Sequence, residues 1–401
     1  MTRWLAIIGV GDDGTDGLSP PARALLDAAE IIVGSERLLG HLSRETARRY
    51  PWTSPLSDMI SKIADWKGRA VVVLATGDPM HFGVGVTLLK HFPADEVTIL
   101  PAPSAFSLAA ARLGWPLQDV ETVSLHGRPA ALIQPLVQPG ARVLALTEGG
   151  ETVGAVAEML RARGYGPSRL TVLEHMGGGD ERQIALTAND RVPKNIAAFS
   201  TLAVECVARG GATVLPRVPG LPDDAFVHDG QLTKRDVRAI TVASLGPVPG
   251  ALLWDLGAGC GSVAIEWMRA ARGARAVAFE RKAERIAMMA ENATALGAPD
   301  LEIVEGELPA TLDGRASPHA LFIGGAVSDA SVFEAAWAAL GAGGRCVANA
   351  VTLEGEAALI DRHRTLGGEL VRIGISEAAP VGRLHAMRPR MSVLQWRATK
   401  S

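Results

Sequence analysis

Glycines and carboxylates in the segment LLWDLGAGCGSVAIEW, residues 252–267, have a spacing that suits a nucleotide-like ligand. An apolar run ends at Asp255, and three glycines follow at alternate positions: Gly257, Gly259 and Gly261. Glycines let the backbone approach a ligand closely, and an amphipathic helix is expected directly after them. A second apolar run ends at Glu280, where a carboxylate can accept hydrogen bonds from ribose hydroxyls. The pattern predicts a cofactor site at the ends of two strands.

The position of the third glycine separates this segment from the dinucleotide fingerprint Gly-x-Gly-x-x-Gly, which would require glycine where Ser262 stands. The pattern Asp-x-Gly-x-Gly-x-Gly with an acidic strand end resembles the motif of the class I methyltransferases, which bind S-adenosylmethionine. The resemblance implies that the residues named above contact this methyl donor. It also implies that Gly306 and Glu307 lie near the adenine and that residues 322–325 (FIGG) border the substrate. A turn whose glycines serve packing alone is the alternative.

Three segments of the first half also follow apolar runs: IIGVGDDG (7–14), ATGDPMHFGVG (75–85) and PAPSAFSLAAARLG (101–114). Gly-Asp-Pro alone is equally compatible with an ordinary turn. Three more segments of the first half belong with these: VSLHGR (123–128), ALTEGG (145–150) and LEHMGGGDERQIALT (173–187). Taken together, these segments resemble the tetrapyrrole methylases, class III methyltransferases that hold S-adenosylmethionine between two α/β lobes. The resemblance covers most of residues 1–210.

This second resemblance implies another methyl-donor site, in the first half of the chain. Eight residues would line it: Gly9, Gly11, Gly77, Asp78, Pro79, Phe82, Ser104 and Ala105. The GVGDDG turn departs from the glycine-proline-glycine turn that relatives usually show. His126, at an expected strand end, is the candidate acid or base of this half, and a structural or solvent-facing histidine is the alternative. The GGGDER loop is expected to be a hairpin rather than a catalytic element.

The elements that must position these residues follow from hydrophobic patterning. Short apolar runs alternate with helical stretches along the chain, which predicts an α/β fold with buried parallel strands. In the first half we expect strands at residues 4–10, 29–33, 70–75, 97–100, 142–146, 171–174 and 202–207. In the second half we expect them at residues 252–255, 276–280, 301–305, 320–323, 345–350, 369–376 and 391–397. Helices are expected between the strands, for example over residues 20–28 and 104–113.

A glycine- and proline-rich segment, residues 209–224, divides the chain. Neither a helix nor a strand can continue through it, so we expect two domains, residues 1–210 and residues 211–401. After it, TKRDVRAITVASLG (233–246) has the pattern of an amphipathic helix with Thr233 as its cap. The expected architecture is a two-lobed tetrapyrrole methylase domain followed by a Rossmann-like class I methyltransferase domain.

Composition disfavours several classes of protein. The 401 residues carry 40 Lys and Arg against 43 Asp and Glu, a net charge of -3, so no global positive field favours nucleic acid. The first apolar run, residues 4–10, is too short to cross a membrane and lacks a signal-peptide pattern. The cysteines form no Cys-x-x-Cys pair, so we expect neither a metal site nor a disulfide framework. A cytoplasmic protein is predicted, and a homo-oligomer is expected.

The two kinds of domain follow one another in an order that is typical of one particular family. A tetrapyrrole methylase joined to a class I methyltransferase through GLPDDAFVHDGQLTKRDVRAIT (220–241) resembles the decarboxylating precorrin C5,15-methyltransferases of cobalamin biosynthesis. The resemblance implies that the first domain methylates C5 of precorrin-6B. The second would methylate C15 and decarboxylate the ring C (C12) acetate, giving precorrin-8. Two S-adenosylmethionine sites per chain and a contact of Thr233 with the donor are also implied.

The tetrapyrrole substrate implied by this resemblance carries many carboxylates, which Lys and Arg side chains can bind. Lys234 and Arg238, on the expected helix, are the candidate catalytic or clamping residues of the second domain. Further candidates lie in PVGRLHAMRPRM (380–391), which we expect to be a loop: Arg383, His385, Arg388 and Arg390. For each of them, a solvated surface cation is the alternative.

Other functions stay open at this point. The chain could methylate another substrate, such as a cobalt-precorrin, uroporphyrinogen or RNA. The net charge and the aromatic content of 4% disfavour RNA, because single strands bind by stacking on aromatic rings. The chain could also be a tetrapyrrole-binding carrier without activity, which the intact glycines and Glu280 disfavour.

Overall fold

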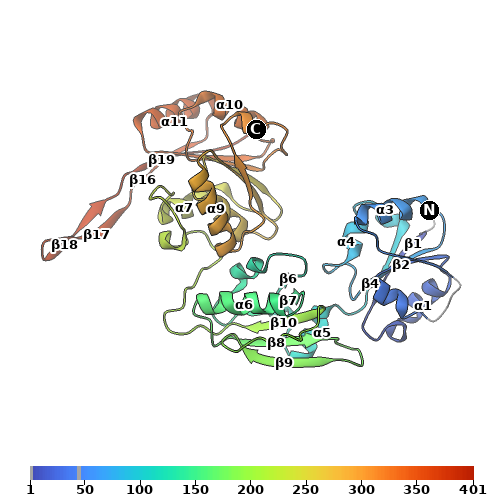
Figure 1. Cartoon of the computed structure of the whole chain (residues 1–401). Coiled ribbons are helices and arrows are strands. Elements are labelled where there is room, and N and C mark those ends of the chain that lie inside the picture. The colour runs from blue at the N-terminus through green and yellow to red at the C-terminus, as the bar shows by residue number, and fades with distance from the viewer. Residues whose placement is uncertain (1–2, 43–46) are drawn as a thin grey trace. The chain divides into compact units, whose positions relative to one another are not determined.

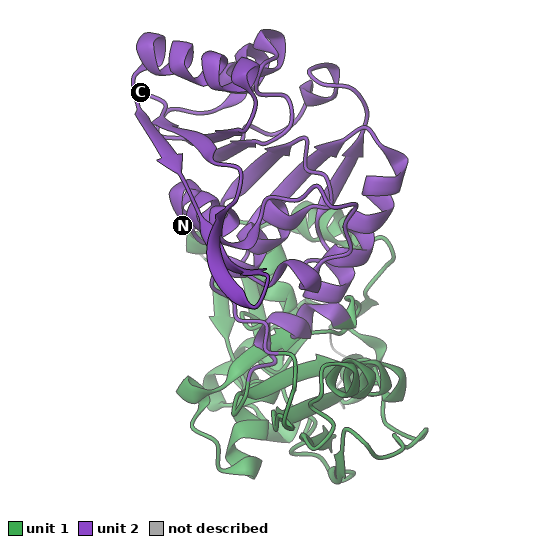
Figure 2. Ribbon diagram, turned by 90° about the vertical axis from the view of Figure 1, so that its left-hand side faces the viewer, with its two compact units in different colours: residues 1–130, 139–213 green, residues 131–138, 214–401 purple. Residues whose placement is uncertain are grey.

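The computed structural model describes residues 3–42 and 47–401, and the chain forms two compact units (Figures 1 and 2). Unit 1 comprises residues 1–130 and 139–213, and unit 2 comprises residues 131–138 and 214–401. The short segment 131–138 belongs to unit 2 because it packs there: the Gln138 amide donates to the Leu215 carbonyl at 2.7 Å. Among the described residues, no helix is both long enough and apolar enough to cross a membrane.

The first lobe of unit 1 is a parallel sheet of five strands. Their order is β3 (Arg48–Pro51), β2 (Ile31–Gly34), β4 (Val71–Thr76), β1 (Leu5–Val10) and β5 (Val97–Leu100). Every residue of β1 and β2 is buried, because apolar clusters form on both faces of the sheet. Four helices accompany these strands: α1 (Pro20–Asp27), α2 (Glu36–Gly40), α3 (Leu56–Asp65) and α4 (Val84–Leu88).

The second lobe of unit 1 is a mixed sheet, drawn in green shades in Figure 1. Its order is β6 (Glu121–Ser124), β7 (Arg142–Thr147), β10 (Ser200–Glu205), β8 (Arg169–Glu174) and β9 (Arg182–Thr187). Only β6 and β7 are parallel, and the other neighbours are antiparallel. Its helices are α5 (Ala105–Leu113) and α6 (Gly150–Ala162), and Ser104 caps α5 by accepting from the Ser107 amide at 3.1 Å.

Unit 2 contains a seven-stranded sheet, in which the last-but-one strand, β19, runs opposite to the other six. The order is β13 (Glu302–Glu305), β12 (Arg275–Glu280), β11 (Leu252–Leu256), β14 (Ala320–Ile323), β15 (Arg345–Ala350), β19 (Val393–Thr399) and β16 (Glu369–Ile373). The strand order reverses between β11 and β14. In open α/β sheets such a reversal creates a crevice outside the carboxyl ends of the strands, where ligands bind.

The helices of unit 2 are α7 (Arg235–Leu245), α8 (Ser262–Ala270), α9 (Ala283–Leu296), α10 (Ala330–Ala339) and α11 (Leu353–Leu366). A two-stranded arm, β17 (Ser376–Val381) and β18 (Leu384–Pro389), extends from the sheet in Figure 1. Short 3-10 helices complete the chain: Thr15–Gly17, Ala94–Glu96, Leu117–Asp119, Ala130–Leu136, Asp223–Ala225 and Ala310–Leu312.

The α/β fold class is confirmed, and several local predictions are wrong. The predicted strand ranges leave out β3, β6 and β9, although a strand end at His126 and a hairpin at GGGDER were expected. The expected loop at 380–391 is mostly the arm β17–β18. Thr233 does not cap α7, because Lys234 is the N-cap and its side chain makes no capping hydrogen bond. The expected hairpin at GGGDER is confirmed, since β8 and β9 pair on either side of it.

Candidate functional site

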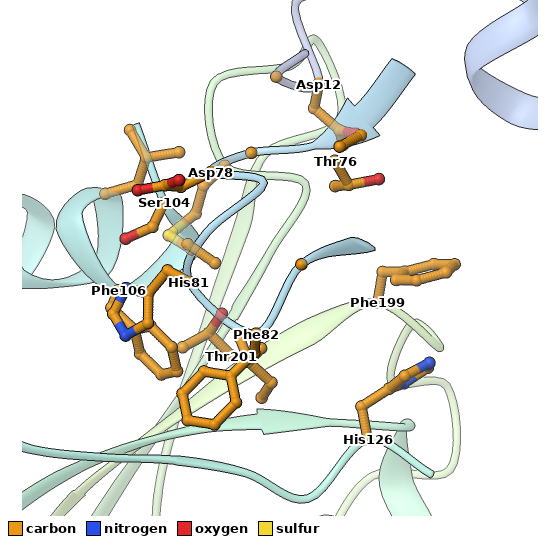
Figure 3. Close-up of a pocket in the computed structure, with 18 of the residues that line it drawn as sticks. Asp12, Thr76, Asp78, His81, Phe82, Ser104, Phe106, His126, Phe199 and Thr201 are labelled. Carbon is orange, nitrogen blue, oxygen red and sulfur yellow. The ribbon is translucent and has the colours of Figure 1, made fainter. Parts of the chain in front are cut away.

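A cavity of about 420 Å³ lies in unit 1, lined by loops from both lobes (Figure 3). Seven predicted site residues line it: Gly11, Gly77, Asp78, Phe82, Ser104, Ala105 and His126. Gly9 and Pro79 are not on its wall. A side chain at Gly9 would place its Cβ 2.1 Å from the Gly77 carbonyl oxygen and 2.4 Å from the Ala102 amide nitrogen. Gly9 therefore serves the close packing of three strand-end turns behind the cavity.

Two aromatic groups flank this cavity, and Figure 3 shows them on opposite sides of it. On one side the His81 ring lies 4.7 Å from Phe106 and 5.4 Å from Phe82. On the other side His126 stacks on Phe199, with ring centroids 5.4 Å apart. Aromatic faces contribute large apolar areas at little entropic cost. The cavity thus offers flat apolar walls to a flat ligand.

A charged cluster that sequence analysis missed lies on the same wall. The Asp12 carboxylate accepts from Arg37, and its second oxygen is 2.9 Å from Nδ1 of His175. Arg37 also donates to Oγ1 of Thr76 at 3.1 Å, and its guanidinium lies 5.7 Å from the Phe199 ring centroid. A polar residue close behind an apolar strand was the available signal, because Asp12 closely follows β1 and His175 directly follows β8.

The hairpin loop that carries His175 is held by Glu181. Both carboxylate oxygens of Glu181 accept from the Arg112 guanidinium at 2.7 Å, and one also accepts from the Gly177 amide at 2.7 Å. These hydrogen bonds, first of all those from Arg112, lower the pKa of Glu181 to about 2. Glu181 therefore orders the loop, as expected of a structural rather than a catalytic residue.

A second cavity, of about 850 Å³, lies in unit 2 at the carboxyl ends of β11, β14 and β15. Of the predicted residues, Thr233, Lys234, Gly257 and Gly259 line it, and so do three residues of the FIGG segment: Phe322, Gly324 and Gly325. The cavity is thus at the point where the strand order reverses, the expected place for a ligand. Both cavities fall within the usual size range of small-molecule sites.

Two glycine turns pack backbone to backbone at this reversal. A Cβ at Gly257 would lie 3.0 Å from the Gly325 Cα, and Gly257 has a positive φ of 72°. Larger residues would separate the turns after β11 and β14, so part of the glycine pattern serves packing. Gly259 differs, because a Cβ there would meet nothing closer than the Gln231 carbonyl oxygen at 3.7 Å.

The remaining predicted residues of this motif lie outside the cavity wall: Asp255, Gly261, Glu280, Gly306 and Glu307. Glu280 is buried and accepts from the amides of Gly259, Arg281 and Lys282 at 2.9–3.1 Å. Its carboxylate therefore shapes the glycine turn. Glu307 is instead exposed and pairs with Arg281 at 3.3 Å.

Comparison with known proteins assigns both units to families. The tetrapyrrole (corrin/porphyrin) methylases match residues 5–190, and a precorrin methyltransferase domain matches residues 224–400. A relative from Sinorhizobium sp, named precorrin-6Y C(5,15)-methyltransferase (decarboxylating), is 48% identical over 401 residues, covering 100% of this chain and 97% of the relative. The chain belongs to the precorrin-6Y C(5,15)-methyltransferase family. The resemblance inferred from the motifs is thereby confirmed.

Two further relatives each match about half of this family member. A cobalt-precorrin-7 C(5)-methyltransferase from Salmonella typhimurium is 29% identical over 178 residues, covering 44% of this chain and 88% of the relative. A crystal structure of the C-terminal domain of the Rhodobacter capsulatus precorrin-6Y C5,15-methyltransferase is 44% identical, covers 46% of this chain and 100% of that chain, and gives a TM-score of 0.44. Membership of a methyltransferase family implies use of S-adenosylmethionine.

Arg238 was predicted to contact the substrate, but it does not line the cavity of unit 2. Its side chain is fully buried, and Nε donates to Glu266 at 2.7 Å. The remaining donors reach Asp223, the Thr233 carbonyl and the Leu221 carbonyl. An arginine with its donors engaged inside the unit cannot clamp a substrate carboxylate, so this prediction is wrong and Arg238 is structural.

The other predicted cationic residues differ in whether they line the cavity. Lys234 is half-buried and lines the cavity, with Nζ 3.5 Å from the Gly230 carbonyl oxygen. Arg390 also lines it and pairs with Glu377 at 2.5 Å, and its buried Nη1 has no hydrogen-bond partner in the part of the chain that the structure describes. The other three candidates are exposed on the arm and its turn: Arg383, His385 and Arg388.

Asp255 gives this family member a testable dependence of stability on pH. The side chain is 1% exposed, one oxygen accepts from the Ala264 amide at 3.1 Å, and the other has no hydrogen-bond partner among the described residues. Burial, with a smaller effect of the Glu280 charge, raises the pKa of Asp255 from 3.8 to about 7. The folded state therefore binds a proton that the unfolded state releases, so this residue's contribution to stability is lost as the pH rises from 4 to 7.

We expect Asp255→Asn to remove this pH-dependent part of the free energy of unfolding. The difference between the two pKa values corresponds to about 4 kcal/mol. Urea unfolding of unit 2 between pH 4 and pH 8 would measure it as the difference between variant and wild type. Asp236→Asn, at an exposed position of α7, is the matched control and should keep the wild-type dependence. An unchanged slope in Asp255→Asn would show that Asp255 does not carry the proton.

Proposed function

We propose that the chain methylates precorrin-6B at C5 and C15 and releases the ring C acetate carboxyl as carbon dioxide, giving precorrin-8. Unit 1 carries out the C5 methylation, and unit 2 carries out the C15 methylation and the decarboxylation. The observation that carries this proposal is the full-length identity of 48% to a relative whose name states both positions and the decarboxylation. The two separate cavities, one in each unit, support the division of labour.

Methyl transfer in either unit depends mainly on the alignment of the donor methyl group with the acceptor carbon. The S–CH3 bond of the sulfonium breaks, a C–CH3 bond forms at an electron-rich meso carbon, and S-adenosylhomocysteine leaves as a neutral sulfide. Holding the two reacting atoms at the right distance supplies most of the acceleration in such a reaction. Strand-end loops on rigid parallel sheets meet this need, because the sheet fixes the loops that surround the donor.

Unit 2 needs in addition a place for the acetate side chain that loses its carboxyl group. The bond between the acetate methylene and its carboxyl carbon breaks, and its electron pair enters the conjugated macrocycle as carbon dioxide leaves. The methylene carbon then takes up a proton and becomes a methyl group. Lys234 and Arg390 line the cavity and are the residues we assign to the substrate carboxylates. Thr233, Gly257 and Gly259 are assigned to the donor on the same wall.

Donor stoichiometry tests the division into two sites. Calorimetric titration of the full chain with S-adenosylhomocysteine should give two bound molecules per chain. In unit 1 the residues assigned to the donor are the ones behind and around the smaller cavity: Gly9, Gly11, Gly77, Asp78, Pro79, Phe82, Ser104 and Ala105. A stoichiometry of one would leave one unit without a donor and overturn the proposal for it.

Analysis of the product tests which substrate the protein uses. Incubation with precorrin-6B and a 13C-methyl donor should yield a product with two labelled methyl groups, at C5 and C15, and without one carboxyl group. Mass spectrometry and 13C NMR read the two changes separately. Turnover only of a cobalt-precorrin, of uroporphyrinogen or of RNA would replace precorrin-6B as the substrate, and binding without turnover would indicate a carrier.

A further inference from the structure

Three histidines line the cavity of unit 1, and they differ in what holds their rings. His81 and His126 pack against aromatic side chains. Within residues 3–42 and 47–401, His175 is the one of the three whose ring nitrogen is hydrogen-bonded to a carboxylate, that of Asp12 at 2.9 Å. A ring held in this way has a fixed orientation and a fixed tautomer.

The tautomer follows from the chemistry of the partners. An ionised carboxylate can only accept, so Nδ1 of His175 carries the hydrogen and Nε2 is left with a lone pair. Arg37 fixes the position of the Asp12 carboxylate, because its guanidinium donates to the other carboxylate oxygen. The ring is thus prepared to accept a proton at Nε2, and the resulting imidazolium would lie against the Asp12 carboxylate.

The backbone at His175 supports a special role. His175 has φ 49°, in the left-handed region that side chains with a Cβ rarely adopt. Its carbonyl accepts from the Gly178 amide at 2.9 Å, and Glu181 fixes the same turn. The turn therefore presents the ring to the cavity at an energetic cost that the surrounding hydrogen bonds offset.

We propose that His175 is the catalytic residue that accepts the proton released by C-methylation in unit 1, with Asp12 and Arg37 as positioning residues. The inference rests on the proposed C5 methylation. Methyl transfer to C5 gives a cationic macrocycle with a tetrahedral C5 that still bears its hydrogen. Loss of that proton to Nε2 of His175 returns the C–H electron pair to the conjugated system, and S-adenosylhomocysteine leaves as a neutral sulfide.

Two carboxylates near His175 in the chain, those of Glu174 and Glu181, are already paired. Glu174, the preceding residue, binds Arg182 through both oxygens at 2.5 and 3.1 Å and also accepts from the Ala197 amide. Hydrogen bonding from Arg182 lowers the pKa of Glu174, which therefore stays ionised and structural. Glu181 is bound to Arg112 on α5. Neither carboxylate competes with His175 for the proton.

His175→Asn tests the proposal in the full chain. Asparagine tolerates the left-handed region, and its amide can still donate to Asp12, so the turn should persist. We expect the C5 methylation rate to fall about 100-fold or more. Binding of S-adenosylhomocysteine at two sites should persist. The fall of the wild-type rate at acid pH, where an imidazole is protonated, should disappear in the variant.

Two further variants separate the alternatives. His126→Asn should raise KM by removing the ring stacked on Phe199, while the decline of the rate at acid pH remains. Asp12→Asn should lower the rate by less than His175→Asn does, because the ring keeps Nε2 and loses only the carboxylate that orients it. These pH profiles distinguish proton acceptance from a purely structural role.

Two results would overturn the proposal. The first is a His175→Asn rate within about threefold of wild type, or one that keeps the acid decline. The second is a variant that loses both donor binding and C5 methylation, which would show that His175 has a structural role. Absence of C5 methylation in the wild-type protein would instead contradict the proposed function, so the two failures are distinguishable.

Discussion

Gly259→Arg is expected to abolish donor binding and C15 methylation in unit 2 while unit 1 continues to bind its donor. Gly259 lines the larger cavity, and a Cβ added there would meet no atom closer than 3.7 Å. An arginine side chain would therefore enter the cavity without disturbing the packing behind it. We expect a loss of at least about 1000-fold, which corresponds to about 4 kcal/mol of donor binding. Titration with S-adenosylhomocysteine should fall from two sites to one.

Gly314→Arg is the matched control for this variant. Gly314 also has a positive φ, 73° against 59° for Gly259, so both substitutions carry a similar backbone cost of about 1–2 kcal/mol. A Cβ at Gly314 meets nothing within 4 Å, and the residue is exposed and outside the cavity wall. The control should keep two sites. Two sites in Gly259→Arg, or one in Gly314→Arg, would contradict a donor path along Gly259.

Burial explains which strands could be predicted from the sequence. Strands β14 and β15 lie inside the seven-stranded sheet, are almost wholly buried, and were predicted with their observed bounds. A strand buried on both faces has a continuous apolar run, which is the clearest sequence signal. Strands β3, β6 and β9, which the predicted strand ranges leave out, are at sheet edges and only partly buried. Their sequences lack such a run because part of each strand faces solvent.

Distance along the chain explains which site residues were missed. Gly257, Gly259 and the FIGG segment lie in local motifs, each read from a few consecutive residues, and they do line the cavity. Asp12 and His175 are 163 positions apart, and only the pairing of the two lobes brings them to 2.9 Å. Both residues lie in segments that carry the family resemblance, but nothing in the sequence indicates that the two are neighbours. Contacts of this kind depend on topology, which hydrophobic patterning does not specify.

Arg238 and Lys234 show that residue type and spacing do not fix a role even on one helix. They are four positions apart, at the start of α7. Lys234 faces the cavity, whereas Arg238 is 0% exposed and its partner Glu266 is 1% exposed. Glu266 also accepts from the amides of Gly220 and Leu221 at 2.7 and 2.9 Å. The buried pair therefore anchors the chain that enters unit 2.

Arg238→Met is consequently expected to lower the free energy of unfolding of unit 2 by about 3–5 kcal/mol, because it leaves the Glu266 charge buried without its partner. Lys234→Met should change the same quantity by less than about 0.5 kcal/mol, because Lys234 makes a single weak contact. Lys234→Met should instead weaken substrate binding. Urea unfolding of the full chain, following the transition of unit 2, measures the first two effects.

The double variant Arg238→Met/Glu266→Met tests the cause of the destabilisation. If the loss arises from an unpaired buried charge, removing Glu266 as well should recover part of the stability, since apolar residues of similar volume replace buried ion pairs at little cost. No recovery would point to the hydrogen bonds that Arg238 gives to the Leu221 and Thr233 carbonyls. Wild-type stability in Arg238→Met, combined with a loss of C15 methylation, would instead return Arg238 to the substrate, as its position in the sequence had indicated.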